Sequence, residues 1–99
     1  MNMLILDRSF HTTKLPTGVV KLYIARNIVE AIDQLDSDYY HIVVAADCIA
    51  GIVLLDNVSA FRVLVGDSNH VDRCISAITD EELNNVAKEC SSRLHQQFR

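Results

Sequence analysis

The apolar run at positions 41–46, HIVVAA, constrains the fold more than any other feature of this sequence. Its apolar side chains do not alternate with polar ones, so both faces of the strand that it predicts must be covered. Such a strand lies inside a sheet that has helices on both sides. Other short runs, rich in β-branched and aromatic residues, predict further strands at 3–6, 19–25, 61–66 and 73–78.

Two amphipathic segments predict helices with defined beginnings. Asn27 and Glu30 form one capping-box pattern, and Thr79 and Glu82 form another. Apolar residues then recur at helical spacing, as Ile28, Ala31, Ile32 and Leu35 in the first helix and as Leu83, Val86, Ala87, Cys90 and Leu94 in the second. Residues 48–60 are apolar with no clear period, and their place between two strands favours a third helix.

The order of these elements predicts one α/β domain over residues 1–99, with a small three-layer, flavodoxin-like fold. We expect a mostly parallel sheet of about five strands with helices on both faces. Residues 8–18 show no helical stripe, so the first helix of a regular α/β winding is missing. Residues 67–72 are too few for an ordinary parallel crossover, which predicts that the last two strands are antiparallel or that the last is a stub.

Composition excludes several classes of function. The formal net charge of −4 over 99 residues, with scattered basic residues, argues against nucleic acid as a partner. No apolar run approaches the roughly 18 residues that span a membrane. Three cysteines without CxxC spacing predict reduced thiols in a cytoplasmic protein, and Cys48 is expected to be a small core residue.

Three acidic residues follow predicted strands: Asp7, Asp47 and Asp67. Ligands of open α/β sheets bind at the carboxyl ends of the strands, and clustered carboxylates there would attract Mg²⁺. Aspartate is also a favoured N-cap, and we favour helix capping for Asp47 over a chemical role. Asp7 and Asp67 are expected to be turn residues at strand ends.

A longer stretch, VVKLYIARNIVEAIDQLDSDYYHIVVAAD, resembles the middle of a chemotaxis-type receiver domain, the phosphoacceptor module of bacterial response regulators. GIVLLDNVSAFRVLVGD resembles the following helix and strand, and SAITDEELNNVAKEC resembles the entry to the last helix. The resemblance covers about three-quarters of the chain and rests on hydrophobic pattern. It implies that Asp47 is the phosphoacceptor and Asp7 an acid of the metal site.

The sequence departs from the receiver pattern at the other functional positions. The second acid of the family falls at Arg8, and its hydroxyl residue falls at Gly66 or Asp67. The Lys-Pro pair before the last helix is replaced by Ser76-Ala77. Phosphoryl transfer needs cations that neutralise developing charge, so the resemblance implies a pseudo-receiver that works without phosphorylation.

The apolar segment 49–58 gives the functional expectation. A helix that is apolar on nearly all sides needs more cover than one sheet provides, which predicts a partner surface formed by Ile52, Leu54, Leu55 and Val58. The partner is another protein or a second copy in a homodimer; alternatively, a neighbouring element or the 8–18 connector covers the helix. The expected function is thus a non-catalytic regulatory or interaction module without a cofactor. The alternative is a Mg²⁺-dependent receiver phosphorylated on Asp47.

Overall fold

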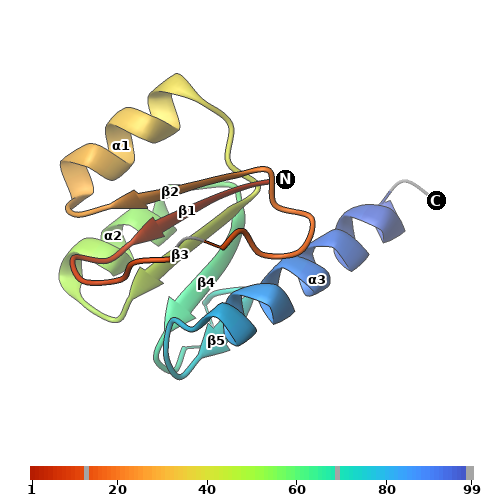
Figure 1. Cartoon of the computed structure of the whole chain (residues 1–99). Coiled ribbons are helices and arrows are strands. Elements are labelled where there is room, and N and C mark those ends of the chain that lie inside the picture. The colour runs from red at the N-terminus through yellow and green to blue at the C-terminus, as the bar shows by residue number, and fades with distance from the viewer. Residues whose placement is uncertain (13, 69, 98–99) are drawn as a thin grey trace.

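The computed structural model describes residues 1–12, 14–68 and 70–97, with side chains as far as Leu94. Five strands form one sheet that lies between helices, as Figure 1 shows. The strands are β1 (Asn2–Leu6), β2 (Lys21–Ala25), β3 (Ile42–Ala46), β4 (Phe61–Val65) and β5 (Arg73–Ile75). The helices are α1 (Ile28–Ser37), α2 (Ile49–Asp56) and α3 (Asp80–Gln97).

The strand order is β2-β1-β3-β4-β5, and every neighbouring pair is parallel. This is the order of a small flavodoxin-like fold, so the predicted fold class is confirmed. β3 lies between β1 and β4. Ile42 and Val44 enter one core and Val43 enters the other, so both faces of β3 are buried, which explains why its sequence is apolar without alternation.

The expectation of an antiparallel final pair is wrong, because β5 runs parallel to β4. Arg73 begins β5 opposite Val63, only two residues before the end of β4. The chain therefore has to return by only about 7 Å along the strand direction. The described residues of this connection, 66–68 and 70–72, contain no crossover helix.

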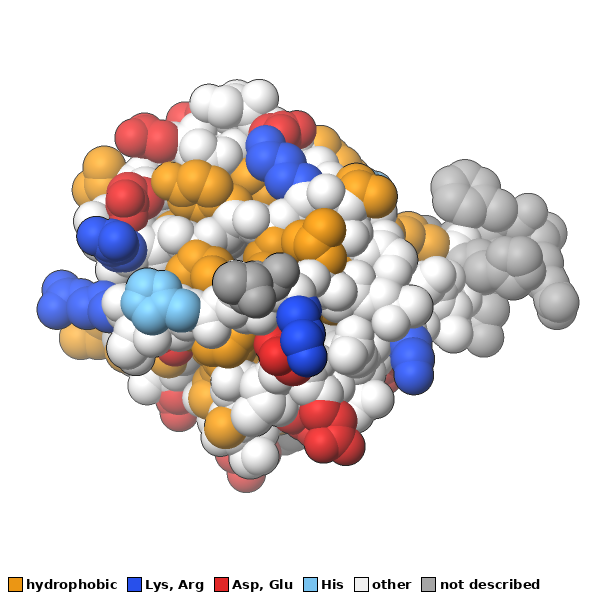
Figure 2. Space-filling model, in the orientation of Figure 1, with side chains coloured by type: hydrophobic (Ala, Val, Ile, Leu, Met, Phe, Trp, Pro, Cys, Tyr) orange, Lys and Arg blue, Asp and Glu red, His pale blue; other side chains and the backbone are white. Residues whose placement is uncertain are grey.

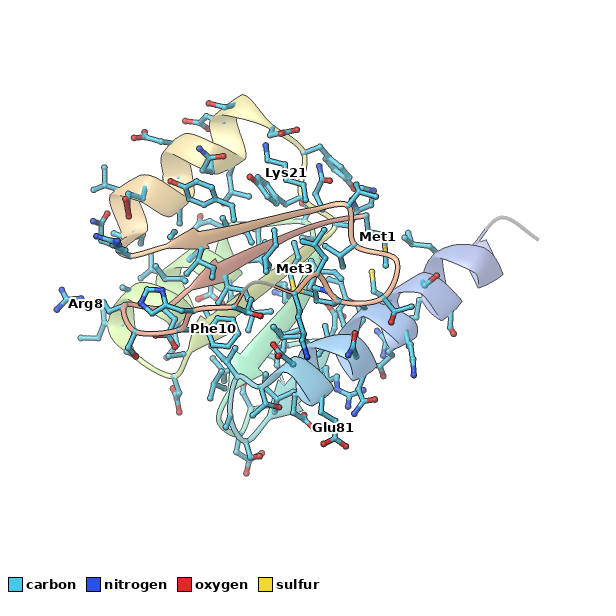
Figure 3. The ribbon with its side chains drawn as sticks, in the orientation of Figure 1. Met1, Met3, Arg8, Phe10, Lys21 and Glu81 are labelled. Carbon is cyan, nitrogen blue, oxygen red and sulfur yellow. The ribbon has the colours of Figure 1, made fainter. Side chains whose placement is uncertain are left out.

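Residues 7–20 join β1 to β2, and no helix forms among the described positions of this connector. Phe10, labelled in Figure 3, and Val19 pack into the core that α3 covers. The Thr17 N–H donates to Asn84 Oδ1 of α3 at 2.8 Å. The first helix is thus missing among the described residues of the connector, as predicted, and the connector covers part of the α3 face of the sheet.

Side chains of the strands alternate between two cores, as expected for a sheet that is covered on both faces. Met3, Ile5 and Val44 point into the core on the α3 side, which Leu83 and Val86 complete. The opposite core contains the following side chains of the strands and of α1 and α2: Leu4, Leu6, Val43, Ala45, Leu64, Ala31, Leu54 and Leu55.

The two predicted helix beginnings are confirmed, with one difference in detail. The Glu30 N–H donates to Asn27 Oδ1 at 2.9 Å, and the Glu82 N–H donates to Thr79 Oγ1 at 3.1 Å. Glu30 reaches back to the N–H of Arg26, at 2.8 Å, where the capping-box pattern predicts the N–H of Asn27.

Candidate functional site

Asp7 follows β1, and its side chain accepts hydrogen bonds from residues that follow it in the chain. Its Oδ1 accepts hydrogen bonds from the N–H of Ser9 at 2.8 Å, the hydroxyl of Ser9 at 3.2 Å and the N–H of Phe10 at 3.3 Å. An aspartate that binds the amides two and three residues ahead holds a turn. The prediction of a strand-end turn residue is confirmed for Asp7.

Asp47 follows β3 and is exposed at the carboxyl edge of the sheet. Its N–H donates to the carbonyl oxygen of Val65 at 3.2 Å. Its side chain packs against Gly66, where an added Cβ would lie 2.9 Å from the Asp47 Cβ. Gly66 has a φ of 154°, so the chain turns there without a side chain that would displace Asp47.

The prediction that Asp47 caps the following helix is wrong. The N-cap of α2 is Cys48, which makes no side-chain capping hydrogen bond. Two consequences follow at this edge. Cys48 is exposed, in contrast to the expected core position, because it occupies the cap outside the first turn. The carboxylate of Asp47 is left on the surface.

Asp47 and Asp67 both line a pocket of about 900 Å³ between α2 and the connection 66–72. Asp7 lines a different pocket of about 450 Å³, together with Arg8, Arg26 and Cys48. Within the described part of the chain, no group of three or more histidine, cysteine, aspartate or glutamate side chains is placed to hold a metal ion. The structure thus brings two of the three strand-end acids together.

The 900 Å³ pocket has an apolar floor and charged walls. Ile52 and Leu55 come from α2, Leu64 from β4, and Val71 from the connection that follows. The charged side chains that line the pocket are Asp47, Asp56, Arg62, Asp67 and Asp72. This pocket is called the α2 groove below.

Arg62 and Asp72 pair with each other inside the α2 groove. Asp72 Oδ2 accepts from the backbone N–H of Arg62 at 2.8 Å and lies 3.9 Å from Arg62 Nε. Asp72 Oδ1 also lies 3.5 Å from Arg93 of α3. Arg62, the one arginine among the described residues of the groove, is therefore engaged by Asp72.

α2 has one buried and one exposed side. Gly51, Leu54 and Leu55 are buried, whereas Ile49 is 85% exposed, Ile52 44% and Val53 46%. These three exposed aliphatic residues, Ile49, Ile52 and Val53, are called the α2 face below. They recur at i, i+3 and i+4, so they lie on one side of the helix.

Two of the four predicted interaction residues are buried and not on the surface. Leu54 and Leu55 are only 3% and 2% exposed, because they pack into the core between α2 and the sheet. Val58 is half-buried against the same core, so of the four predicted residues Ile52 lies on the exposed surface. The pattern of residues 49–58 could not separate the two sides, because both are apolar.

Phe10 and Val19 of the connector pack on the α3 side of the sheet, so the described residues of the connector do not cover the α2 face. α1 is the helical neighbour of α2 and contributes two further exposed apolar residues, Val29 at 65% and Ile32 at 46%. The sequence pattern predicts a buried stripe that includes Ile32, whereas α1 packs against β1, β2 and α2 in a way that leaves Ile32 exposed. Figure 2 shows one side of the molecule, on which side chains of both charges are interspersed with apolar ones.

A cluster of polar side chains lies at the opposite edge of the sheet. Lys21 and Asp38 form an ion pair that raises the pKa of the Lys21 ammonium and lowers the pKa of the Asp38 carboxyl. Burial raises the pKa of the Tyr40 phenol, whose hydroxyl lies 2.9 Å from Gln34 Oε1. Tyr40 is 3% exposed, so the cluster anchors the segment between α1 and β3.

His41 lies beside this cluster and is held as the neutral imidazole. Its Nδ1 accepts a hydrogen bond from the Asn2 N–H at 3.1 Å, and its ring meets Tyr39 edge-on at 4.7 Å. Burial lowers the pKa of His41, and the positive charge of the N-terminus lowers it further. Burial also raises the pKa of the Cys90 thiol, which keeps it protonated within the core.

No helix of the described residues is long and apolar enough to cross a membrane. Comparisons of this chain with protein-family models, with curated proteins and with solved structures find no match.

Proposed function

We propose that this chain is a cytoplasmic, non-catalytic protein-interaction module that binds through the α2 face, in the manner of a phosphorylation-independent pseudo-receiver. The observation that carries the proposal is the exposure of Ile49, Ile52 and Val53 on one side of an eight-residue helix. Aliphatic residues that gather on one surface mark interaction sites more often than single exposed ones do. The partner is another protein, a second copy of the chain included.

The non-catalytic part of the proposal is supported by the side chains near Asp47. The position that follows β5 holds Ser76-Ala77 where a receiver has its lysine, and Arg8 replaces the second acid after β1. Arg62 lines the same groove as Asp47 but pairs with Asp72. A phosphoryl group that formed on Asp47 would therefore find no unpaired lysine or arginine among the described residues that line this groove.

Charge substitution on the α2 face tests the proposal. If the partner is a second copy, Val53→Asp and Ile52→Asp should abolish the concentration-dependent self-association that light scattering measures. If the partner is another protein, the same variants should no longer capture it. Val20→Asp is the matched control, since Val20 is 76% exposed outside the helices. Equal behaviour of Val53→Asp and Val20→Asp in both measurements would contradict a role of the α2 face.

The second candidate function is a Mg²⁺-dependent phosphoacceptor that uses Asp47. One observation favours it: Asp47 is exposed at the end of the central strand instead of capping α2, so a phosphodonor could reach its carboxylate. Intact-mass measurement after incubation with acetyl phosphate and Mg²⁺ distinguishes the two functions. A gain of one phosphoryl group that disappears in Asp47→Asn would favour the phosphoacceptor over the pseudo-receiver.

A further inference from the structure

β1 and β3 are neighbours in the sheet, and their connections leave toward opposite faces. The connection after β1 carries Phe10 into the core on the α3 side, whereas the connection after β3 carries Leu54 and Leu55 into the opposite core. Where neighbouring parallel strands diverge in this way, a crevice opens beyond their carboxyl ends, and open α/β sheets bind ligands there. Leu6 and Ala46, the last residues of the two strands, line a pocket of about 450 Å³ at this point. This pocket is called the β1–β3 crevice below.

The beginnings of two helices complete the β1–β3 crevice. It is lined by Asn27 and Ile28 at the start of α1 and by Cys48 and Ala50 at the start of α2. Ile28, Ala46 and Ala50 are half-buried, so each of them still presents apolar surface to an occupant. The volume of the crevice falls within the range of roughly 300–1,000 Å³ that is usual for small-molecule sites. The crevice therefore has room and apolar surface for a small organic group.

Two arginines give the β1–β3 crevice a positive balance. Arg8 follows β1 by two residues, Arg26 follows β2 directly, and both line the crevice and are exposed. None of the ion pairs among the described residues includes either of them. Figures 1 and 3 show Arg8 at the end of the molecule where α1 and α2 begin. Asp7 also lines the crevice, but two arginines outweigh one aspartate here, in a chain whose net charge is −4.

The first turn of α2 adds backbone donors at the same place. Cys48, the N-cap, makes no side-chain capping hydrogen bond, and within the described residues the N–H groups of Ile49, Ala50 and Gly51 have no acceptor. In α1, by contrast, the side chain of Asn27 accepts from a first-turn N–H. Free N–H groups at the positive end of a helix dipole favour an anion. Guanidinium groups beside them favour an anion with several acceptor oxygens.

We infer that the β1–β3 crevice binds a small organic phosphate, with the phosphoryl oxygens at Arg8, Arg26 and the first N–H groups of α2. The organic part then lies against Ile28 and Ala46. A phosphate monoester carries about two negative charges and three acceptor oxygens, whereas a carboxylate carries one charge and two oxygens and would use fewer of these donors. The inference goes beyond the proposed function, because neither the α2 face nor Asp47 lines the crevice.

Titration calorimetry of the full chain with phenyl phosphate tests the inference. Phenyl phosphate should bind more tightly than inorganic phosphate, which lacks the organic part, and more tightly than phenol, which lacks the charge. The double variant R8Q/R26Q should weaken binding of phenyl phosphate at least about tenfold. The matched control K14Q/K88Q removes the same charge from exposed positions outside the crevice and should leave affinity unchanged within about twofold.

Backbone amide NMR of the native chain locates the ligand without any variant. Addition of phenyl phosphate should shift the amide signals of Ile49, Ala50 and Gly51, which lie in the first turn of α2. The amide signals of Glu81 and Glu82, in the first turn of α3, should stay in place.

Several outcomes would overturn the inference: phenyl phosphate fails to bind at millimolar concentration, both double variants have equal affinity, or the shifted amides lie outside the first turn of α2. Equal binding of inorganic phosphate would leave a site for an inorganic anion only. Tighter binding of a phosphotyrosine peptide would assign the crevice to a modified protein. Either of these last two results also overturns the inference.

Discussion

A β-carbon on Gly51 would overlap the carbonyl oxygen of Ala46, the last residue of β3. α2 therefore approaches the end of β3 more closely than any residue with a side chain allows. Gly51 is buried in the helix at this contact. Ile49, Ile52 and Val53 are exposed on the same helix.

Gly51→Ala should destabilise the protein, although alanine is the better helix former by about 1 kcal/mol. The overlapping atom belongs to the backbone of a central strand and cannot move without shifting that strand, so overpacking should cost about 1–3 kcal/mol net. Urea denaturation measures the difference, with Ile49→Ala in the same helix as a control that changes stability little. An unchanged or higher midpoint for Gly51→Ala would contradict the close approach.

Leu55 and Ile52 should respond differently to truncation. Leu55→Ala removes a side chain that is 2% exposed and should lower the free energy of unfolding by about 2–5 kcal/mol. Ile52→Ala removes a side chain that is 44% exposed and should cost less than about 1 kcal/mol. Thermal or chemical denaturation of the two variants decides this, and equal losses would mean that α2 packs with a different side toward the sheet.

Asp7→Ala should destabilise the protein by about 1–2 kcal/mol, because it removes the acceptor of the hydrogen bonds from Ser9 and Phe10. Asp7→Asn keeps a side-chain oxygen and should recover part of the loss. Asp67→Ala, after β4, which is separated from β1 by β3, is the control and should be near neutral. A stability gain in Asp7→Ala would instead indicate repulsion among carboxylates, as a metal site would produce.

His41 should make stability depend on pH in the weakly acidic range. Its pKa is lowered in the folded protein, so the unfolded chain binds its proton more readily. The contribution of the neutral ring is complete above the unfolded pKa of about 6.5 and is lost as pH falls through that range toward the folded pKa.

The measurement is the unfolding midpoint of the native chain and of His41→Asn between pH 7 and pH 5. Protonation would also place a hydrogen on Nδ1 against the N–H of Asn2, which adds to the loss. The native chain should lose more stability than the variant over this interval. Parallel curves would show that other groups account for the pH dependence.

The fold could be predicted because apolar residues recur in the sequence with the spacing that each helix or strand needs to bury one or both of its faces. The run at 41–46 is apolar on both faces of the strand, and residues of β3 do enter the cores on both sides of the sheet. Asn27 and Thr79 marked two helix beginnings through side chains that bind the first-turn amides. These signals are local, so one sequence is enough to detect them.

The candidate site depended on relations that local patterns do not contain. Asp47 precedes a helix, but the cap position falls one residue later because α2 begins where Gly51 can approach Ala46. Leu54 and Ile52 are equally apolar, and only the placement of α2 on the sheet separates the buried from the exposed one. The parallel direction of β5 is possible with a short connection because β5 begins opposite Val63, close to the end of β4. The length of a connection does not reveal this register.

The three-residue length of β5 has a consequence for how this protein resists aggregation. A border strand with so few backbone groups offers little template for another chain to extend the hydrogen-bond ladder. The opposite border, β2, is five residues long and begins with a lysine, a residue that discourages such stacking. Addition of a strand from another chain is thereby disfavoured at both edges of the sheet. Recognition of a partner would then use side-chain surfaces.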